Sequence, residues 1–325
     1  MNNNALILAC EKGQKGVVTA LLKTKKNEID KRDNLGNTAL HFACEKGNKD
    51  IVKLLLQNDA QVDIANNNGV TALHAASKKG NKEIIEMLLE KDANIDEIDN
   101  NGKTAIMYSI SESKTEASLF LINKGCNKDI IDNNGYTAMN YASSVGLREV
   151  VKALSSDKQN KDNNGNTSLH HACITGQSEI VHALLDNKNL DINAFNDEGQ
   201  TALNIACQMK NIVIVEALLK HNANVNLKSL EGNAPIHFLA NQGNISIAKL
   251  LVKNNAEINI KNLSGETPLI VAALAGENDF VRYLLECKVD ISATDNDGHD
   301  ALYYASEGGY TEIVEMLIIA EAEQE

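Results

Sequence analysis

A glycine recurs along this chain of 325 residues at an almost constant spacing. Successive copies are separated by 33, 33, 33, 30, 34, 33, 33 and 33 residues. They are Gly36, Gly69, Gly102, Gly135, Gly165, Gly199, Gly232, Gly265 and Gly298. A fixed period of this length is the signature of a repeat architecture, because one such unit is too small to bury its own apolar face. We therefore expect the units to stack, each one contacting its neighbours along the chain.

Every unit carries the same succession of local signals. The glycine closes a polar tip such as "DNLG", and Asp or Asn first with Gly fourth is the preference of a type I turn. A threonine such as Thr38 follows in helix N-cap position, and the short run "ALHFAC" leads to Gly47, which suits a left-handed C-cap. A second segment, such as residues 51–56, then carries a broad apolar face. The pattern predicts two helices per unit.

One full unit, "DNLGNTALHFACEKGNKDIVKLLLQNDAQVDIA", resembles the ankyrin repeat, whose first helix has the signature Thr-Pro-Leu-His. The resemblance covers nearly the whole chain and implies an all-α repeat solenoid of stacked antiparallel helix pairs with short β-hairpin-like tips. It predicts a single domain over residues 1–325 with about ten repeats. The repeats begin near Met1, Asp33, Asn66, Asp99, Asp132, Asp162, Asn196, Ser229, Asn262 and Asp295.

Some repeats depart from this pattern near the middle of the chain. The fifth repeat is three residues short, since "SSDKQNKDNNG" follows Leu154 directly. In the fourth repeat, Ser113 replaces the glycine that ends the first helix, and Ser118 stands where the second helix usually has a Val-like core residue. We expect the solenoid to be least regular between residues 110 and 162.

The histidines and cysteines occupy repeat-equivalent positions rather than the spacings of a metal site. The signature histidine is present as His41, His74, His170 and His237, and the resemblance implies that its ring hydrogen-bonds neighbouring backbone. Four cysteines, including Cys44 and Cys173, take the small-residue position that Ala76 fills in the third repeat, which predicts buried thiols. No phosphate-binding loop, dinucleotide turn or nucleophile elbow is present. We expect no metal, no cofactor and no catalytic residue.

The formal charge of −13 disfavours a nucleic-acid binder. Residues 1–103 hold fifteen basic and fifteen acidic side chains, whereas residues 104–325 hold sixteen basic and twenty-nine acidic ones. No apolar run is long enough for a membrane helix, and the N-terminus has no basic region of the kind that precedes a secretory signal. We expect a cytoplasmic monomer that does not insert into membranes.

The resemblance implies a binding surface made of the turn tips and the exposed side of the first helices, together a concave groove. Positions carried over from the family are charged early in the chain and apolar in the middle. The early positions are Leu35, Lys78, Lys79 and Lys103, and the middle ones are Tyr136, Val145, Ile174, Phe195, Met209 and Leu230. Apolar side chains that gather on a surface indicate a binding site. The alternative is that some of them turn inward and fill space around the shortened fifth repeat.

These features predict a non-enzymatic scaffold or adaptor that binds another protein in the groove. The alternative is a targeting or substrate-recruiting arm of a larger enzyme or effector. The full-length reading frame would separate the two. Because one fold serves many functions, this functional prediction depends on the analogy with the family.

Overall fold

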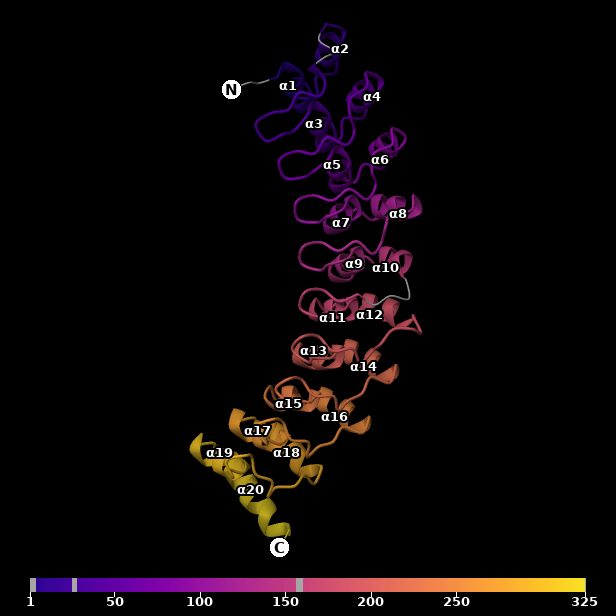
Figure 1. Cartoon of the computed structure of the whole chain (residues 1–325). Helices are drawn as coiled ribbons and strands as arrows, with labels where there is room; N and C mark the ends of the chain where they lie inside the picture. The colour runs from indigo at the N-terminus through magenta and orange to yellow at the C-terminus, as the bar shows by residue number, and fades with distance from the viewer. Residues whose placement is uncertain (1–3, 25–27, 156–159, 325) are drawn as a thin grey trace. The chain divides into compact units, whose positions relative to one another are not determined.

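The computed structural model describes residues 4–24, 28–155 and 160–324, and its described residues form helix pairs joined by short loops. The chain divides into two compact units, residues 1–156 and 157–325. Within each unit, Figure 1 shows the first helices of the pairs in one row and the second helices in another. None of the described helices is long and apolar enough to span a lipid bilayer.

The first helices of the pairs are short and form the inner row. They are α1 (Ala5–Glu11), α3 (Ala39–Lys46), α5 (Ala72–Lys79), α7 (Ala105–Ser111) and α9 (Ala138–Val145) in the first unit, and α11 (Ser168–Ile174), α13 (Ala202–Gln208), α15 (Pro235–Ala240), α17 (Pro268–Ala275) and α19 (Ala301–Glu307) in the second. Each packs against the next first helix of its unit. Small side chains such as Ala43, Cys44 and Ala76 are fully buried there, so the helices approach closely.

The second helices form the outer row and are mostly longer. They are α2 (Lys15–Thr24), α4 (Lys49–Gln57), α6 (Lys82–Leu89), α8 (Thr115–Asn123) and α10 (Arg148–Leu154), followed by α12 (Ser178–Leu185), α14 (Ile212–Lys220), α16 (Ile245–Lys253), α18 (Asn278–Glu286) and α20 (Thr311–Gln324). Each buries one apolar face, as α4 does with Ile51, Val52 and Leu55. The apolar core of each unit therefore lies between its two rows of helices.

The predicted helix ends are confirmed. Thr38 is the N-cap of α3, and Gly47 ends it with a φ of 74°. In addition, Pro235 and Pro268 are the first residues of α15 and α17, where a missing amide proton costs little. Ser113 and Lys210 replace the C-terminal glycine in two repeats, yet both have a φ of 56°. The left-handed turn is therefore kept even where the residue is poorly suited to it.

Hydrogen bonds between consecutive tips form a ladder along the repeats. In the first unit, the backbone N–H of Asn67 donates to the carbonyl of Leu35 (2.9 Å), and that of Asn100 donates to the carbonyl of Asn68 (3.0 Å). The Nδ2 of Asn67, Asn100 and Asn133 each donates to a carbonyl of the preceding tip at 3.0 Å. These bonds explain why asparagine is so frequent at the tips, where its amide satisfies backbone that a turn leaves unpaired.

Within repeat four, the polar residue in the core has a partner. The hydroxyl of the buried Ser118 lies 2.8 Å from that of Ser109, and it also donates to the carbonyl of Lys114 (2.9 Å). A buried hydroxyl costs little when it is hydrogen-bonded. The predicted irregular stretch, residues 110–162, includes the boundary between the two units. Residues 156–159 of the shortened loop lie outside the described residues.

Candidate protein-binding surface

The signature histidines link each repeat to the next one. In repeat two, Nδ1 of His41 accepts from the backbone N–H of Thr38 (3.1 Å), and Nε2 lies 2.9 Å from the carbonyl of Val70 in repeat three. His74 makes the same contacts with Thr71 and with the next repeat. Burial lowers the pKa of both rings, so they are neutral at pH 7. The predicted structural role of these histidines is confirmed, and they bring no charge to the surface above them.

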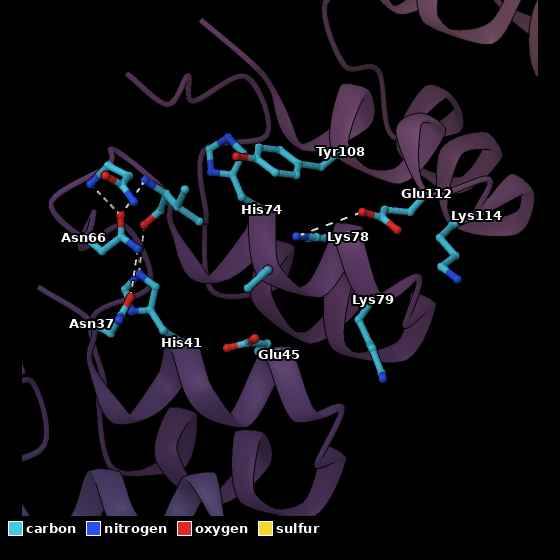
Figure 2. A pocket seen from close by; sticks show the side chains of 13 residues that line it. Asn37, His41, Glu45, Asn66, His74, Lys78, Lys79, Tyr108, Glu112 and Lys114 are labelled. Atoms are coloured by element: carbon cyan, nitrogen blue, oxygen red, sulfur yellow. Dashed lines mark hydrogen bonds and ion pairs between the residues drawn. The ribbon is translucent and has the colours of Figure 1, made fainter. Parts of the chain in front are cut away.

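A groove of about 730 Å³ lies over these histidines in repeats two to four of the first unit (Figure 2). Its floor includes His41, His74 and Ala75. One wall, the tip wall, consists of tip residues, and the other, the helix-end wall, consists of residues at the C-terminal ends of the first helices. The lining residues are Asn37, His41, Glu45, Asn66, Asn68, Val70, His74, Ala75, Lys78, Lys79, Tyr108, Glu112 and Lys114. Its volume is in the usual range for ligand-binding clefts, but its lining is mostly polar.

The groove is hollow because of one small side chain. Nine residues after the start of its tip, repeat two has Phe42, repeat four has Tyr108 and repeat five has Tyr141, whereas repeat three has Ala75. Tyr108 leans toward repeat three, and its ring centroid lies 5.4 Å from that of His74. Ala75 lines the groove together with Tyr108, and its methyl group fills less of this space than an aromatic ring would.

The tip wall is held by a hydrogen bond between repeats. Nδ2 of Asn66 donates to Oδ1 of Asn37 at 2.8 Å, while Nδ2 of Asn37 donates to Oδ2 of Asp33 at 3.3 Å. Asn66 also uses its Oδ1 to accept from the backbone N–H groups of Asn68 and Val70. The wall is thus fixed by its own bonds, and the exposed side chain of Asn68 is presented to the groove.

The helix-end wall is charged. Nζ of Lys78 lies 4.0 Å from Oε1 of Glu112, and both side chains are about half exposed, so this pair contributes little to stability. Among the described residues, no carboxylate lies within ion-pair distance of Lys79 or Lys114, the other basic residues of the wall. The aliphatic stem of Lys114 packs where a Cβ on Gly80 would stand, 2.7 Å away, and so its ammonium is directed outward.

The family follows from a comparison with models of known families. A model described as ankyrin repeats matches residues 6–99, 91–163, 155–229 and 236–325, which is nearly the whole chain. The chain belongs to the ankyrin-repeat family. The predicted all-α ankyrin-repeat solenoid is therefore confirmed. A comparison with curated proteins found no significant match. Ankyrin repeats generally mediate protein–protein interactions, and the family is typically non-enzymatic.

Four residues predicted from the ankyrin pattern lie in the first unit outside the groove lining. Leu35 is exposed at its tip, where 67% of its surface is accessible. Lys103 and Tyr136 are half-buried and meet at a third residue, Tyr141. Nζ of Lys103 lies 4.9 Å from the ring centroid of Tyr141, and the ring of Tyr136 lies edge-on to it at 5.6 Å. Val145, also half-buried, is the last residue of α9. Only Lys78 and Lys79 of the predicted residues line the groove.

The other four predicted residues lie in the second unit and are exposed. Ile174 ends α11, Met209 is the C-cap of α13, and Leu230 is at a tip, with 42%, 54% and 68% of their surfaces accessible. Phe195 is 40% accessible and lines a shallow hollow of about 590 Å³ together with Asn193 and Leu227. Their role in binding stays a prediction.

Sequence reasoning missed the residues that create the groove, above all Ala75, Asn66 and Tyr108. The available signal was the contrast between Ala75 and the aromatic residues at the same position of neighbouring ankyrin repeats. It also missed that Asp295, Asp297 and His299 place one ligand atom each within 4.8 Å of one another. The Asp295 carboxylate already accepts from the Tyr304 hydroxyl and from two backbone N–H groups. We therefore assign this acidic tip to turn structure.

The thiols are placed as predicted. Cys10, Cys44, Cys173 and Cys207 are buried in the inner row of helices, and none of the six cysteines is in a disulfide. Burial raises the pKa of the Cys10 thiol to about 12 and that of Cys126 to about 11. A thiol that stays protonated at pH 7 is a poor nucleophile.

Proposed function

We propose that this ankyrin-repeat protein is a non-enzymatic adaptor that binds a segment of a partner protein in the groove over Ala75. The observation that supports the proposal is the hollow itself, which exists because repeat three has alanine where its neighbours have aromatic residues. Its walls are fixed by hydrogen bonds between repeats, so a ligand would meet a largely preformed surface. A cytoplasmic location, a monomeric state and a scaffold role belong to the same proposal.

The chemistry of the groove supports binding more than catalysis. Its histidines use their ring nitrogens to hold the backbone, and the hydroxyl of Tyr108 donates to Asp99 at 2.8 Å. Groups engaged in this way are poorly placed to transfer protons to a ligand. If the chain is a recruiting arm of a larger enzyme or effector, the same groove would hold the recruited protein. Ile174, Phe195, Met209 and Leu230 are proposed further contacts for a protein partner.

The test fills the groove without disturbing the fold. Phe42 and Phe238 occupy the position of Ala75 in other repeats, so Ala75→Phe inserts a side chain that this stack already accommodates. Peptides selected from a random displayed library on the wild-type protein should bind Ala75→Phe at least tenfold more weakly. Interface anchors commonly contribute about 2 kcal/mol or more, which corresponds to roughly thirtyfold in affinity.

Lys53→Phe is the matched control, because Lys53 is exposed on the outer helix α4. It adds the same aromatic surface away from the groove and should leave binding unchanged. Both variants should keep the wild-type melting temperature within a few degrees. The proposal is wrong if the library yields no binders, or if the selected peptides bind Ala75→Phe as tightly as they bind the wild type.

A further inference from the structure

A row of lysines continues the helix-end wall of the groove across three repeats. Lys12, Lys46 and Lys79 each stand directly before a left-handed glycine at the end of a first helix, and all three are exposed. They come from repeats one, two and three of the same unit, whose first helices α1, α3 and α5 pack in succession. Lys79 lies in the groove lining. We refer to these three residues as the lysine row.

The lysine row is not used by the fold. Two nearby lysines form ion pairs between repeats: Nζ of Lys15 lies 3.0 Å from Oδ2 of Asp50, and Nζ of Lys49 lies 2.5 Å from Oε1 of Glu83. No described carboxylate lies within ion-pair distance of any member of the row. Cγ of Lys79 is 3.8 Å from where a Cβ on Gly47 would stand, so its stem packs toward repeat two while its charge remains exposed.

Helix capping alone does not account for the row. A lysine at a helix C-terminus interacts favourably with the helix dipole, and this would be a sufficient reason if every such helix had one. However, α9 and α17 have the same length as α3 and α5, and the corresponding residues are Val145 and Ala275. From repeat four onward, no basic residue occupies this position, where Glu112, Val145, Thr175, Met209, Gln242, Ala275 and Gly308 stand instead. Basic residues at this position are thus confined to repeats one to three, and repeats two and three also form part of the groove.

We propose that the lysine row binds an acidic segment in polyproline II conformation, with a carboxylate at every third residue. This inference rests on the proposed function of the groove and names the chemistry of its partner. Packed helices lie about 8–10 Å apart, which sets the spacing of the three ammonium groups. A polyproline II helix rises about 3.1 Å per residue with three residues per turn, so every third side chain lies on one face about 9 Å from the last. A β-strand would place every third side chain on alternating faces.

The charges beside the row favour a peptide over a nucleic acid. Glu11 and Glu45 directly precede Lys12 and Lys46, and Glu112 lies close to Lys78. A nucleic acid carries a charge at every step of its backbone and would place phosphates against these carboxylates. A peptide with neutral residues between its acidic ones avoids that repulsion. The exposed amide of Asn68 on the opposite wall is a further donor for peptide carbonyls.

The experiment measures binding of a synthetic peptide to the full chain by fluorescence anisotropy at physiological ionic strength, where charges more than about 8 Å away are largely screened. The probe is a labelled peptide of about four Glu-Pro-Pro units, which is preorganised in the required conformation. A second peptide has the same number of Glu and Pro residues but places Glu at every second position, which matches the charge and breaks the register. A short single-stranded oligonucleotide is the third probe.

We expect the Glu-Pro-Pro peptide to bind and the out-of-register peptide to bind several-fold more weakly. The triple variant Lys12→Gln, Lys46→Gln, Lys79→Gln should lose at least about tenfold in affinity, because each of the three exposed pairs contributes a factor of roughly two to five. The charge-matched control Lys23→Gln, Lys53→Gln, Lys91→Gln changes three exposed lysines outside the row and should lose less than about threefold, because salt screens distant charges.

Four results would overturn the inference: no binding of the Glu-Pro-Pro peptide, equal binding of the two peptides, equal losses in the two triple variants, or tighter binding of the oligonucleotide. These results are separable from a failure of the proposed function. If library peptides bind and are lost in Ala75→Phe while the Glu-Pro-Pro peptide does not bind, the groove proposal stands and the lysine-row inference fails. If the lysine row binds the acidic peptide while Ala75→Phe has no effect on any ligand, the groove proposal fails and the binding of an acidic segment by the lysine row stands.

Discussion

The choice between Asp and Asn at the start of each tip follows from which hydrogen-bond partner is present. Asp99 accepts the hydroxyl of Tyr108 from its own repeat at 2.8 Å, and Asp132 accepts that of Tyr141 at 2.7 Å. Where the tip begins with Asn, its Nδ2 instead donates to an Asn of the preceding repeat. The pairs are Asn66 with Asn37, Asn196 with Asn166, and Asn262 with Asn233. A carboxylate needs a donor and an amide needs an acceptor, and each tip residue has what it needs.

This complementarity predicts a rescue. In Asn66→Asp, the new carboxylate faces Oδ1 of Asn37, and turning the Asn37 amide around would place that oxygen against Asp33. We expect Asn66→Asp to lower the free energy of unfolding by about 1–2 kcal/mol at pH 7. Adding Ala75→Tyr should restore most of the lost free energy of unfolding in the double variant, because repeats four and five pair Asp and Tyr at these positions.

Urea unfolding of the two single variants and the double variant forms a double-mutant cycle. A coupling of about 1 kcal/mol or more in the stabilising direction is expected. Additive effects would show that the tyrosine of repeats four and five does not support the tip aspartate.

The buried histidines make the protein sensitive to acid. Burial lowers the pKa of His170 to about 4, from an ordinary value of 6.5. As the pH falls below 6.5, the unfolded chain takes up a proton that the folded chain refuses, so stability decreases until the pH reaches the folded value. Between pH 7 and pH 5, this one residue should lower the free energy of unfolding by about 2 kcal/mol. Burial also lowers the pKa of His41, His74 and His237.

The chain provides a natural replacement that does not titrate. Asn204 occupies the same position in repeat seven, where its Oδ1 accepts from Thr201 and its Nδ2 donates to Leu227 and Asn233. We expect His170→Asn to fold at pH 7. Between pH 7 and pH 5, its free energy of unfolding should fall by about 2 kcal/mol less than that of the wild type. Chemical unfolding at both pH values tests this, with the exposed His182→Asn as control. Equal losses in His170→Asn and the wild type would contradict it.

At the scale of single elements, most of the structure could be predicted from the sequence. Threonine caps, left-handed glycines and the two prolines at helix starts are local signals, each with a fixed physical cause. The groove could not be predicted in this way, because it depends on a small side chain at Ala75 where the two adjacent repeats, about 33 residues away in sequence, have aromatic ones. No local pattern marks an empty space. Similarly, the bond between Asn66 and Asn37 depends on how two repeats align in the stack.

Two first helices, α7 and α13, are followed by a left-handed residue that is not glycine, and they give a further prediction. Lys210 follows α13 with a φ of 56°, a conformation that costs a residue with a Cβ about 1 kcal/mol or more. We expect Lys210→Gly to raise the free energy of unfolding by about 1 kcal/mol, after allowing for the greater freedom of glycine in the unfolded chain. Gly176→Lys is the reciprocal variant in the same unit, and a Cβ there would meet only Nδ2 of Asn211, at 3.6 Å.

Gly176→Lys should therefore lower the free energy of unfolding by about the same amount, because of its backbone conformation alone. The urea midpoint of each variant, at an unchanged m-value, measures the effect. If the two variants shift the midpoint in the same direction, the backbone explanation is wrong.

At the scale of the whole molecule, the net charge of −13 and the lysine row act over different distances. A chain with this surplus of acid repels an acidic partner from afar, and the surplus comes from residues 104–325. In physiological salt such repulsion fades over about 8 Å, whereas contacts at the row are made within that distance. Total charge was therefore a poor guide to the chemistry of the groove, because the arrangement of the lysines appears only when the repeats are aligned.

The tip pairing also limits how a gene for this chain can grow. A copy of the fourth repeat can be inserted beside itself, since the hydrogen bond between Tyr108 and Asp99 lies within that repeat. The fifth repeat begins with the same "DNNG" tip and has Tyr141 in the same place. A copy of the third repeat inserted after itself would place its first asparagine next to Val70, which offers no side-chain acceptor. The third repeat is thus expected to duplicate only together with the second, while repeats that combine Asp and Tyr are free to multiply singly.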